Sequence, residues 1–183
     1  ALGADYWKPI QAGDLDHSDS HKVARLVQHP DSVIHPNAYA LNTPMSPHAA
    51  AEIDGLRIEL HTIRPPETAN TLVIEGAGGL LVPLNDSDTI AELVRPEYRV
   101  VVVSRHYLGS INHTLLTVEA LRNRGIRPAL LFNGEEHPST ESIIQKRTGC
   151  PVLGRIRPLD PVNPDTVQQE ALRLRPALLS WLS

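Results

Sequence analysis

The residue that says most about chemistry is Glu75, which stands directly between the apolar run 72–74 and the glycine-rich turn 76–79 (Gly-Ala-Gly-Gly). A carboxylate at the end of a strand can bind Mg2+ directly or through water. Glycines behind it allow backbone amides to approach phosphate oxygens, because no Cβ stands in the way. A surface acid beside a tight turn would have the same local sequence. Glu75 taken alone therefore leaves a phosphate site and a plain turn equally open.

A cation stands at the end of another apolar segment. Lys8 is followed by Pro9, which stiffens the backbone at this point. In that position the ammonium group could contact a phosphate or another developing anion. Most lysines are instead solvated, so the alternative for Lys8 is a solvent-exposed side chain. Tyr6 and Trp7, just before it, are predicted to be core or wall residues.

The acidic run 14–21, DLDHSDSH, suggests two metal sites that its spacing does not support. In a calcium loop starting at residue 14, Asp19 would replace the required glycine and Arg25 the bidentate glutamate. His17 and His21 have the i, i+4 spacing of zinc ligands, but no third ligand follows in a recognisable pattern. We therefore expect a solvated polar loop, in which Asp19 could still help to hold Mg2+ near phosphates.

The elements that must position these side chains follow from the apolar pattern. Five short segments bounded by turn residues predict strands at 6–10, 71–74, 100–103, 129–132 and 152–153. Helices are expected at 47–53, 139–147 and 166–182, the last with Val167, Ala171, Leu174 and Leu178 on one face. Another helix should place Ile111, Leu115, Leu116 and Leu121 on one face and end before Gly125. Continuous apolar strands with helices between them predict an α/β fold with a mostly parallel sheet covered on both faces.

Composition narrows the class of protein. The 183 residues are 41% hydrophobic and 21% charged, which predicts one globular domain, residues 1–183. No run approaches the roughly 18 apolar residues of a membrane span, and the N-terminus lacks the layout of a signal peptide. A net charge of −4 without a basic block argues against nucleic acid. Cys150, the single cysteine, excludes an internal disulfide and is expected to be buried. We expect a cytoplasmic protein that acts on small molecules.

Ligands of open α/β sheets bind beyond the carboxyl ends of the strands, and the residues there form an ordered set of motifs. These are YWKPIQAG, HSDS, TPMSPHAAA, VIEGAGGLLVPL, LGSINHTLLTVEALRNRGI, LLFNGE and PVLGRIRPL. In this order they resemble dethiobiotin synthetase, from residue 5 to about residue 159. Each motif alone is weak evidence for the family, but the ordered set is specific to it. Asn133 illustrates this, because its amide could read a purine edge or equally cap a turn.

The resemblance implies a P-loop NTPase-like fold, a homodimer and an enzyme of biotin biosynthesis. Members of the family close the ureido ring of dethiobiotin from diaminopelargonic acid and carbon dioxide, with ATP as co-substrate and Mg2+ as cofactor. An amine of the substrate first takes up carbon dioxide as a carbamate, which ATP phosphorylates. The second amine then attacks the mixed anhydride and expels phosphate.

Motif by motif, the resemblance implies roles for single residues. Lys8 would be the catalytic lysine, and Asp19 and Glu75 the carboxylates associated with the metal. The implied ATP-binding residues are Asp19, Glu75, Gly76, Ala77, Gly78 and, as the adenine pocket, Asn133, Gly134, Pro158 and Leu159. The implied substrate-binding residues are Gln11, Ala12, Gly109, Ser110 and Asn112. The last three fall in the segment that approaches the substrate carboxylate of the neighbouring subunit in family dimers.

The sequence departs from the family pattern at two places. Ala12 stands where some relatives have a substrate-contacting hydroxyl residue, with Gln11 as the nearest polar replacement. No Walker A motif, G-x-x-x-x-G-K-[ST], occurs in the 183 residues. We therefore expect the family's first strand, Walker A loop and first helix to be absent from this chain, and the neighbouring strand edges to be exposed.

Three interpretations of this absence remain open. In the first, the chain is a fragment of a complete enzyme, and Ala1 in place of an initiator methionine favours this interpretation. In the second, a separate polypeptide supplies the loop. In the third, the chain is a natural truncation that retains only ligand binding. We do not expect the 183 residues to be active unless the Walker A loop is supplied. The functional alternatives are another amide-forming P-loop ligase and a non-catalytic module that binds nucleotide or another ligand.

Overall fold

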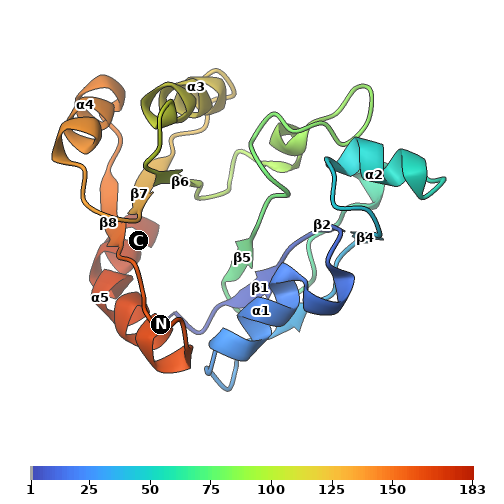
Figure 1. Ribbon diagram of the computed structural model, residues 1–183, viewed down its shortest axis with the longest axis horizontal. Coiled ribbons are helices and arrows are strands. Elements are labelled where there is room, and N and C mark those ends of the chain that lie inside the picture. The colour runs from blue at the N-terminus through green and yellow to red at the C-terminus, as the bar shows by residue number, and fades with distance from the viewer. Residues whose placement is uncertain (1) are drawn as a thin grey trace. The chain divides into compact units, whose positions relative to one another are not determined.

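The structure, a computed structural model, describes residues 2–183 (Figure 1). Contacts divide the chain into two compact units, a first unit that ends at Val94 and a second unit, Arg95–Ser183. Each unit contains its own parallel strands and its own apolar core. The single domain expected over residues 1–183 stays a prediction.

The first unit contains five short strands that pair in parallel. β1 (Asp5–Trp7) lies between β3 (Ile34–His35) and β5 (Leu72–Ile74), and β2 (Ile10–Ala12) pairs with β4 (Tyr39–Leu41). The prediction of one strand over 6–10 is therefore wrong. The chain leaves β1 at Lys8 and Pro9, because proline has no N–H for a sheet hydrogen bond. β3 and β4 were not predicted.

Helices follow the strands of the first unit. The α-helices are α1 (Asp19–Leu26) and α2 (Pro47–Ile53), and the short 3-10 helices are η1 (Leu15–His17), η2 (Leu60–Thr62) and η3 (Ile90–Leu93). Both histidines of the run 14–21 are exposed, as expected, but the expected loop conformation is wrong because they lie in η1 and α1. Ser18 is the N-cap of α1 and its side chain accepts a hydrogen bond from the backbone N–H of His21, which favours a helix over a loop. The core of this unit is formed by Trp7, Ile10, Leu41, Ala50, Ala51, Ile58, Ile63, Leu84 and Ile90.

The second unit is a parallel sheet covered on both faces. β6 (Val101–Arg105), β7 (Ala129–Asn133) and β8 (Val152–Ile156) pair in the order β6-β7-β8. Side chains alternate along β7. Leu130 and Phe132 share a core with residues of α3 (Ser110–Arg122) and α4 (Pro138–Thr148). Ala129 and Leu131 pack with Leu174 of α5 (Pro164–Leu182). Figure 1 shows α5 on the opposite side of these strands from α3 and α4.

The predicted buried face of α3 is confirmed at Leu121 but wrong at Ile111 and Leu116. That of α5 is confirmed at Leu174 and Leu178. The buried residues of α3 are Ser110, Thr114, Val118 and Leu121. Ile111 and Leu116, expected inside, are 37% and 54% exposed. Polar residues can be buried on this face because the hydroxyls of Ser104 and Thr114 form a 2.8 Å hydrogen bond.

The outer strands of each sheet have one edge without a partner among residues 2–183, and β5 and β6 are two of these strands. β5 pairs only with β1, and β6 pairs only with β7. Val73 and Val103, on these strands, are 48% and 54% exposed. The absence of the family's first strand stays a prediction. In the part of the chain that the structure describes, no helix combines the length and apolar character needed to cross a membrane.

Candidate active site at the ends of β1 and β5

The side chain of Lys8 lies between two carboxylates. Its Nζ donates to Oδ2 of Asp19 at 2.5 Å and to Oε1 of Glu75 at 3.3 Å. The lysine is buried, while the side chains of Asp19 and Glu75 are 35% and 45% exposed. The hydrogen bond from Lys8 lowers the pKa of Asp19, against the opposing effect of partial burial. One cation is thus held between two solvent-accessible anions.

Strand pairing explains why Lys8 and Glu75 meet. Trp7 and Ile74 are register partners in parallel strands, so the next residue of each strand lies at the same edge. The backbone N–H of Glu75 donates to the carbonyl of Trp7 at 2.9 Å. On the other side, the amide of Asn37 donates to the carbonyl of Lys8 at 2.6 Å. The backbone on which the lysine stands is therefore held from both neighbouring segments.

Gln11 connects the strand region to the start of α1. Its side-chain oxygen accepts from the backbone N–H of Asp19 at 3.4 Å, and its nitrogen donates to the carbonyl of Gly13 at 2.9 Å. Gln11 is buried, and its amide is occupied at both ends. The geometry shows an anchor for Asp19. The expected substrate contact of Gln11 stays a prediction, as does that of Ala12 at the end of β2.

Tyr6 is a site residue that the sequence analysis assigned only to the core or wall. Its hydroxyl donates to Oε2 of Glu75 at 2.6 Å, and the residue is buried. Burial and then this hydrogen bond raise the pKa of Tyr6. The signal was present in the spacing, because residues two apart in a strand point to the same side. Tyr6 and Lys8 therefore both reach Glu75.

The turn after Glu75 is half-buried and offers free backbone donors. The N–H groups of Gly76, Ala77 and Gly78 make no hydrogen bond with any group in residues 2–183. Gly78 has φ +89, a conformation that side chains with a Cβ rarely adopt. Ala77 packs on the core of the first unit and holds the turn in place. Such a turn can bind phosphate oxygens through its amides.

The predicted adenine residues lie at the carboxyl ends of two neighbouring strands in the second unit. Asn133 ends β7, and the N–H of Gly134 donates to the carbonyl of Ile156 at 2.9 Å. Pro158 and Leu159 follow β8 closely. The predicted substrate residues of this unit follow the carboxyl end of β6: Gly109 is the N-cap of α3, Ser110 is buried in its first turn and Asn112 is exposed.

A glutamate in α4 whose side chain is only 16% exposed, Glu141, holds the loop that follows Asn133. Glu141 accepts hydrogen bonds from the ring of His106 at 2.8 Å and from the backbone N–H of His137 at 3.1 Å. It also accepts two from Arg155, which donates in turn to the carbonyl of Glu135 at 3.0 Å. Burial raises the pKa of Glu141, but the hydrogen bonds from Arg155, His137 and His106 outweigh it and lower the value. Sequence reasoning did not find this network, because its members are far apart in the chain.

A second glutamate, which is buried, holds the loop after β8. Glu170 of α5 accepts from the backbone N–H of Arg157 at 2.9 Å and from its side chain at 2.9 Å. It also accepts from the guanidinium of Arg173. The hydrogen bonds from Arg173 and Arg157 lower the pKa of Glu170 far below its usual range. The residue before Pro158 is thereby fixed to α5.

The chemistry of the donor set fits Mg2+. This ion prefers oxygen ligands and is usually held by one or two carboxylates, with waters and substrate phosphates completing the shell. Asp19 and Glu75 offer two such carboxylates, both within hydrogen-bond reach of one Lys8 nitrogen. No cluster of three or more His, Cys, Asp or Glu that could hold a metal occurs within residues 2–183.

Comparisons with known proteins identify the family. A family model described as an AAA domain matches residues 1–166. The ATP-dependent dethiobiotin synthetase BioD of Christiangramia forsetii is 62% identical over 157 residues, which cover 85% of this chain and 76% of that protein. The protein of the same name from Cytophaga hutchinsonii is 48% identical over 177 residues, with 95% and 85% covered. The one from Rhodopseudomonas palustris strain BisB18 is 50% identical over 170 residues, with 91% and 81% covered. The chain belongs to the dethiobiotin synthetase family.

Membership in the dethiobiotin synthetase family confirms the resemblance inferred from the ordered motifs. A synthetase is an enzyme of the ligase class, so the prediction of an enzyme is confirmed as well. The match to an AAA domain, together with strands that pair in parallel in both units, confirms the α/β, P-loop NTPase-like fold class.

Proposed function

We propose that this chain of the dethiobiotin synthetase family closes the ureido ring of dethiobiotin from diaminopelargonic acid and carbon dioxide, using ATP and Mg2+. The relatives' shared name supports the activity. The observation that carries the chemistry is the buried Lys8 between Asp19 and Glu75, beside a turn whose amides are free. This arrangement suits a reaction in which the carbamate, the transferred phosphoryl group and the nucleotide carry negative charge.

Lys8 is proposed to stabilise the charge that develops on the carbamate and on the transferred phosphoryl group. An ammonium group has three hydrogens, and Asp19 and Glu75 accept two of them. The third is available to a substrate oxygen, since no other group in residues 2–183 accepts from it. A buried cation interacts with an anion more strongly than a solvated one, because less water screens the pair.

Asp19 and Glu75 are proposed to hold Mg2+, which would neutralise charge on the phosphates when bound. Tyr6 and Lys8 each donate to Glu75, so the carboxylate has a fixed orientation. Gln11 similarly fixes the start of α1 and with it Asp19. The amides of residues 76–78 are proposed to bind phosphate oxygens next to these carboxylates.

The proposed reaction balances in three steps. One amine of the substrate bonds to the carbon of carbon dioxide and loses a proton, giving a carbamate. A carbamate oxygen then bonds to the γ-phosphorus of ATP as the bond to ADP breaks. The second amine attacks the carbonyl carbon, the carbon–oxygen bond to phosphate breaks, and phosphate and a proton leave. Lys8 faces the oxygen that becomes more negative in the last two steps.

The remaining residues are proposed to position the ligands. Asn133 has both a donor and an acceptor on one amide and would read the edge of adenine, with Gly134, Pro158 and Leu159 forming the pocket. Gln11, Ala12, Gly109, Ser110 and Asn112 are proposed to contact the substrate. For Gly109, Ser110 and Asn112 this contact would be made across a homodimer. We further propose that the enzyme acts in the cytoplasm.

Mass spectrometry for dethiobiotin tests the proposal. The chain is mixed with diaminopelargonic acid, bicarbonate, Mg2+ and ATP, with the Christiangramia forsetii relative as positive control. A chimera that carries the N-terminal segment of that relative ahead of residue 5 separates the absence of a Walker A motif from residues 1–183 from lack of the activity. Product from either form supports the proposal. Nucleotide binding with no product from either form would contradict it and favour a non-catalytic binding module.

A further inference from the structure

A hollow of about 560 Å3 lies in the second unit, at the amino ends of β7 and β8. It is lined by two arginines, by the apolar residues Ile126, Pro128 and Pro151, and by Cys150. The residues proposed to bind adenine follow the carboxyl ends of the same two strands. The hollow is therefore at the opposite end of this sheet, and the proposed reaction does not use it.

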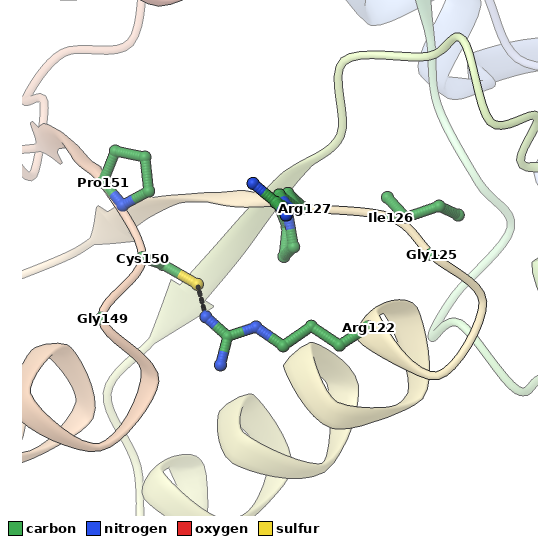
Figure 2. Close-up of a pocket in the computed structure, with 8 residues that line it drawn as sticks. Arg122, Gly125, Ile126, Arg127, Gly149, Cys150 and Pro151 are labelled. Carbon is green, nitrogen blue, oxygen red and sulfur yellow. Dashed lines mark hydrogen bonds between the residues drawn. The ribbon is translucent and has the colours of Figure 1, made fainter.

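Two guanidinium groups line the hollow without a carboxylate partner. Arg122 extends from α3 and donates to the carbonyl of Thr148 and, at 3.5 Å, to the sulfur of Cys150 (Figure 2). Arg127 makes no hydrogen bond or ion pair with any group in residues 2–183. Both arginines are exposed. A guanidinium is always charged and presents a planar fork that matches carboxylate and phosphate. The hollow thus presents positive charge that the described chain does not neutralise.

The rest of the wall is poor in free donors. Pro128 and Pro151 have no N–H. The N–H of Ile126 donates to the carbonyl of Leu121, and the N–H of Cys150 donates to the hydroxyl of Thr148. The guanidinium groups are therefore the polar anchors, and the wall between them is built from hydrocarbon. A ligand that fits both has an anionic end and an apolar body.

We propose that this hollow is a binding site for an aliphatic carboxylate. Arg122 and Arg127 bind its charged end, and Pro151, which is the exposed one of the three apolar residues, contacts its chain. This site is independent of the proposed catalytic function, because it uses other residues at the other end of the sheet.

Amide NMR of the full 183-residue chain titrated with hexanoate tests the site. Gly125 and Gly149 line the hollow, whereas Gly76 and Gly78 lie in the turn after β5, so the two pairs of amides report the two places separately. We expect saturable shifts at the first pair and none at the second. Hexylammonium, which has the same chain with the opposite charge, should shift neither pair. Equal shifts with hexylammonium would overturn the proposal.

Inorganic phosphate and three variants sharpen the test. Phosphate should bind about tenfold more weakly than hexanoate, since it has no apolar body. Tighter binding of phosphate would overturn the carboxylate assignment in favour of a phosphate ligand. Arg127→Gln should raise the Kd for hexanoate about tenfold through loss of a charge-assisted hydrogen bond. Arg122→Gln should do the same, with thermal unfolding recorded because this variant also loses the bond to Thr148.

Arg147→Gln is the matched control. Arg147 is exposed in the last turn of α4 and is not part of the wall. Its replacement should leave the Kd unchanged. Equal affinity in Arg127→Gln and the unchanged chain, or no saturable shift at Gly125 and Gly149, would overturn the proposal.

Discussion

The two units use their charged residues in different ways. In the first unit, Lys8 contacts both Asp19, at the start of α1, and Glu75, just after β5, and both carboxylates remain accessible to solvent. In the second unit, Glu141 and Glu170 are turned inward and bind backbone groups and arginines that fix two loops. In the first arrangement the charged groups remain available to a ligand, whereas in the second they hold the backbone in place. We therefore expect substitutions in the first unit to change turnover, and those in the second to change stability and nucleotide affinity.

The largest effect is expected for Lys8→Gln. Turnover should fall about 1000-fold, because the charge that develops in the transition state loses its buried partner. The KM for ATP should change less than about threefold. Steady-state kinetics measures both. Lys22→Gln is the control, since Lys22 also contacts Asp19, at 3.2 Å, but its side chain is 52% exposed. A loss confined to ATP affinity would make Lys8 a ground-state anchor instead.

Glu75→Gln should lower turnover about 100-fold and raise the Mg2+ concentration needed for half-maximal velocity. The amide keeps an oxygen for Lys8 but removes the negative charge. Velocity as a function of Mg2+ concentration measures the effect. Glu52→Gln, an exposed change on α2, should alter neither quantity. Unchanged Mg2+ dependence in Glu75→Gln would remove this residue from the metal site.

In the second unit, Glu170→Ala should lower the free energy of unfolding by about 2 to 3 kcal/mol. This loss of unfolding free energy should not exceed the smallest loss typical of a broken buried ion pair. The reason is that the Arg157 side chain is 62% exposed and can turn to solvent. The KM for ATP should rise about fivefold as the loop at Pro158 loosens, with turnover nearly unchanged. Denaturant unfolding and kinetics measure the two effects, with Asp165→Asn as an exposed control. A fall in turnover at constant KM would contradict the expected difference between the two units.

Tyr6→Phe tests whether the hydroxyl positions Glu75. Turnover should fall about tenfold and the Mg2+ requirement should rise, because Glu75 loses one of its two donors. Tyr39→Phe is matched, since the hydroxyl of Tyr39 bonds to Thr62 and to the backbone of Glu59. That variant should alter stability alone. Equal Mg2+ profiles for Tyr6→Phe and the unchanged enzyme would reduce Tyr6 to a packing role.

The smallest effect concerns pH. The pKa of Glu170 is lowered in the folded state, so its contribution to stability is present above the ordinary carboxyl value of 4.5 and is lost as the pH falls towards the folded-state value. The difference in unfolding free energy between the unchanged chain and Glu170→Gln should be constant near neutral pH. It should shrink below about pH 4.5. Denaturant unfolding across this range measures it, and a difference that grew on acidification would have the wrong sign.

The sequence predicted the parts of the site that depend on local order along the chain. Apolar runs located β5, β6, β7 and β8, and Lys8 and Glu75 were each predicted to stand at the end of a strand, where ligands of open α/β sheets bind. The structure brings Lys8, Asp19 and Glu75 into contact there. The predicted strand over 6–10 failed at Pro9, because an apolar run does not show where a missing N–H breaks the sheet.

What the sequence could not predict depends on partners distant in the chain. The hydroxyls of Ser104 and Thr114 satisfy each other on the buried face of α3, and no periodicity of apolar residues contains that information. Glu141 and Glu170 look like ordinary surface acids of amphipathic helices. Their role depends on arginines of β8 and of the loop after it, and on Arg173 of α5.

The alternation of side chains along β7 has a consequence for how the second unit opens. Leu130 and Phe132 belong to one apolar cluster, and Ala129 and Leu131 to the other, while both edges of the strand are paired. Neither cluster can come apart without loosening the same backbone. Local fluctuations should therefore free α4 or α5 at their ends, but release β7 only when the whole unit unfolds. In hydrogen exchange, the amides of β7 should be the slowest of the second unit, with one shared free energy of opening.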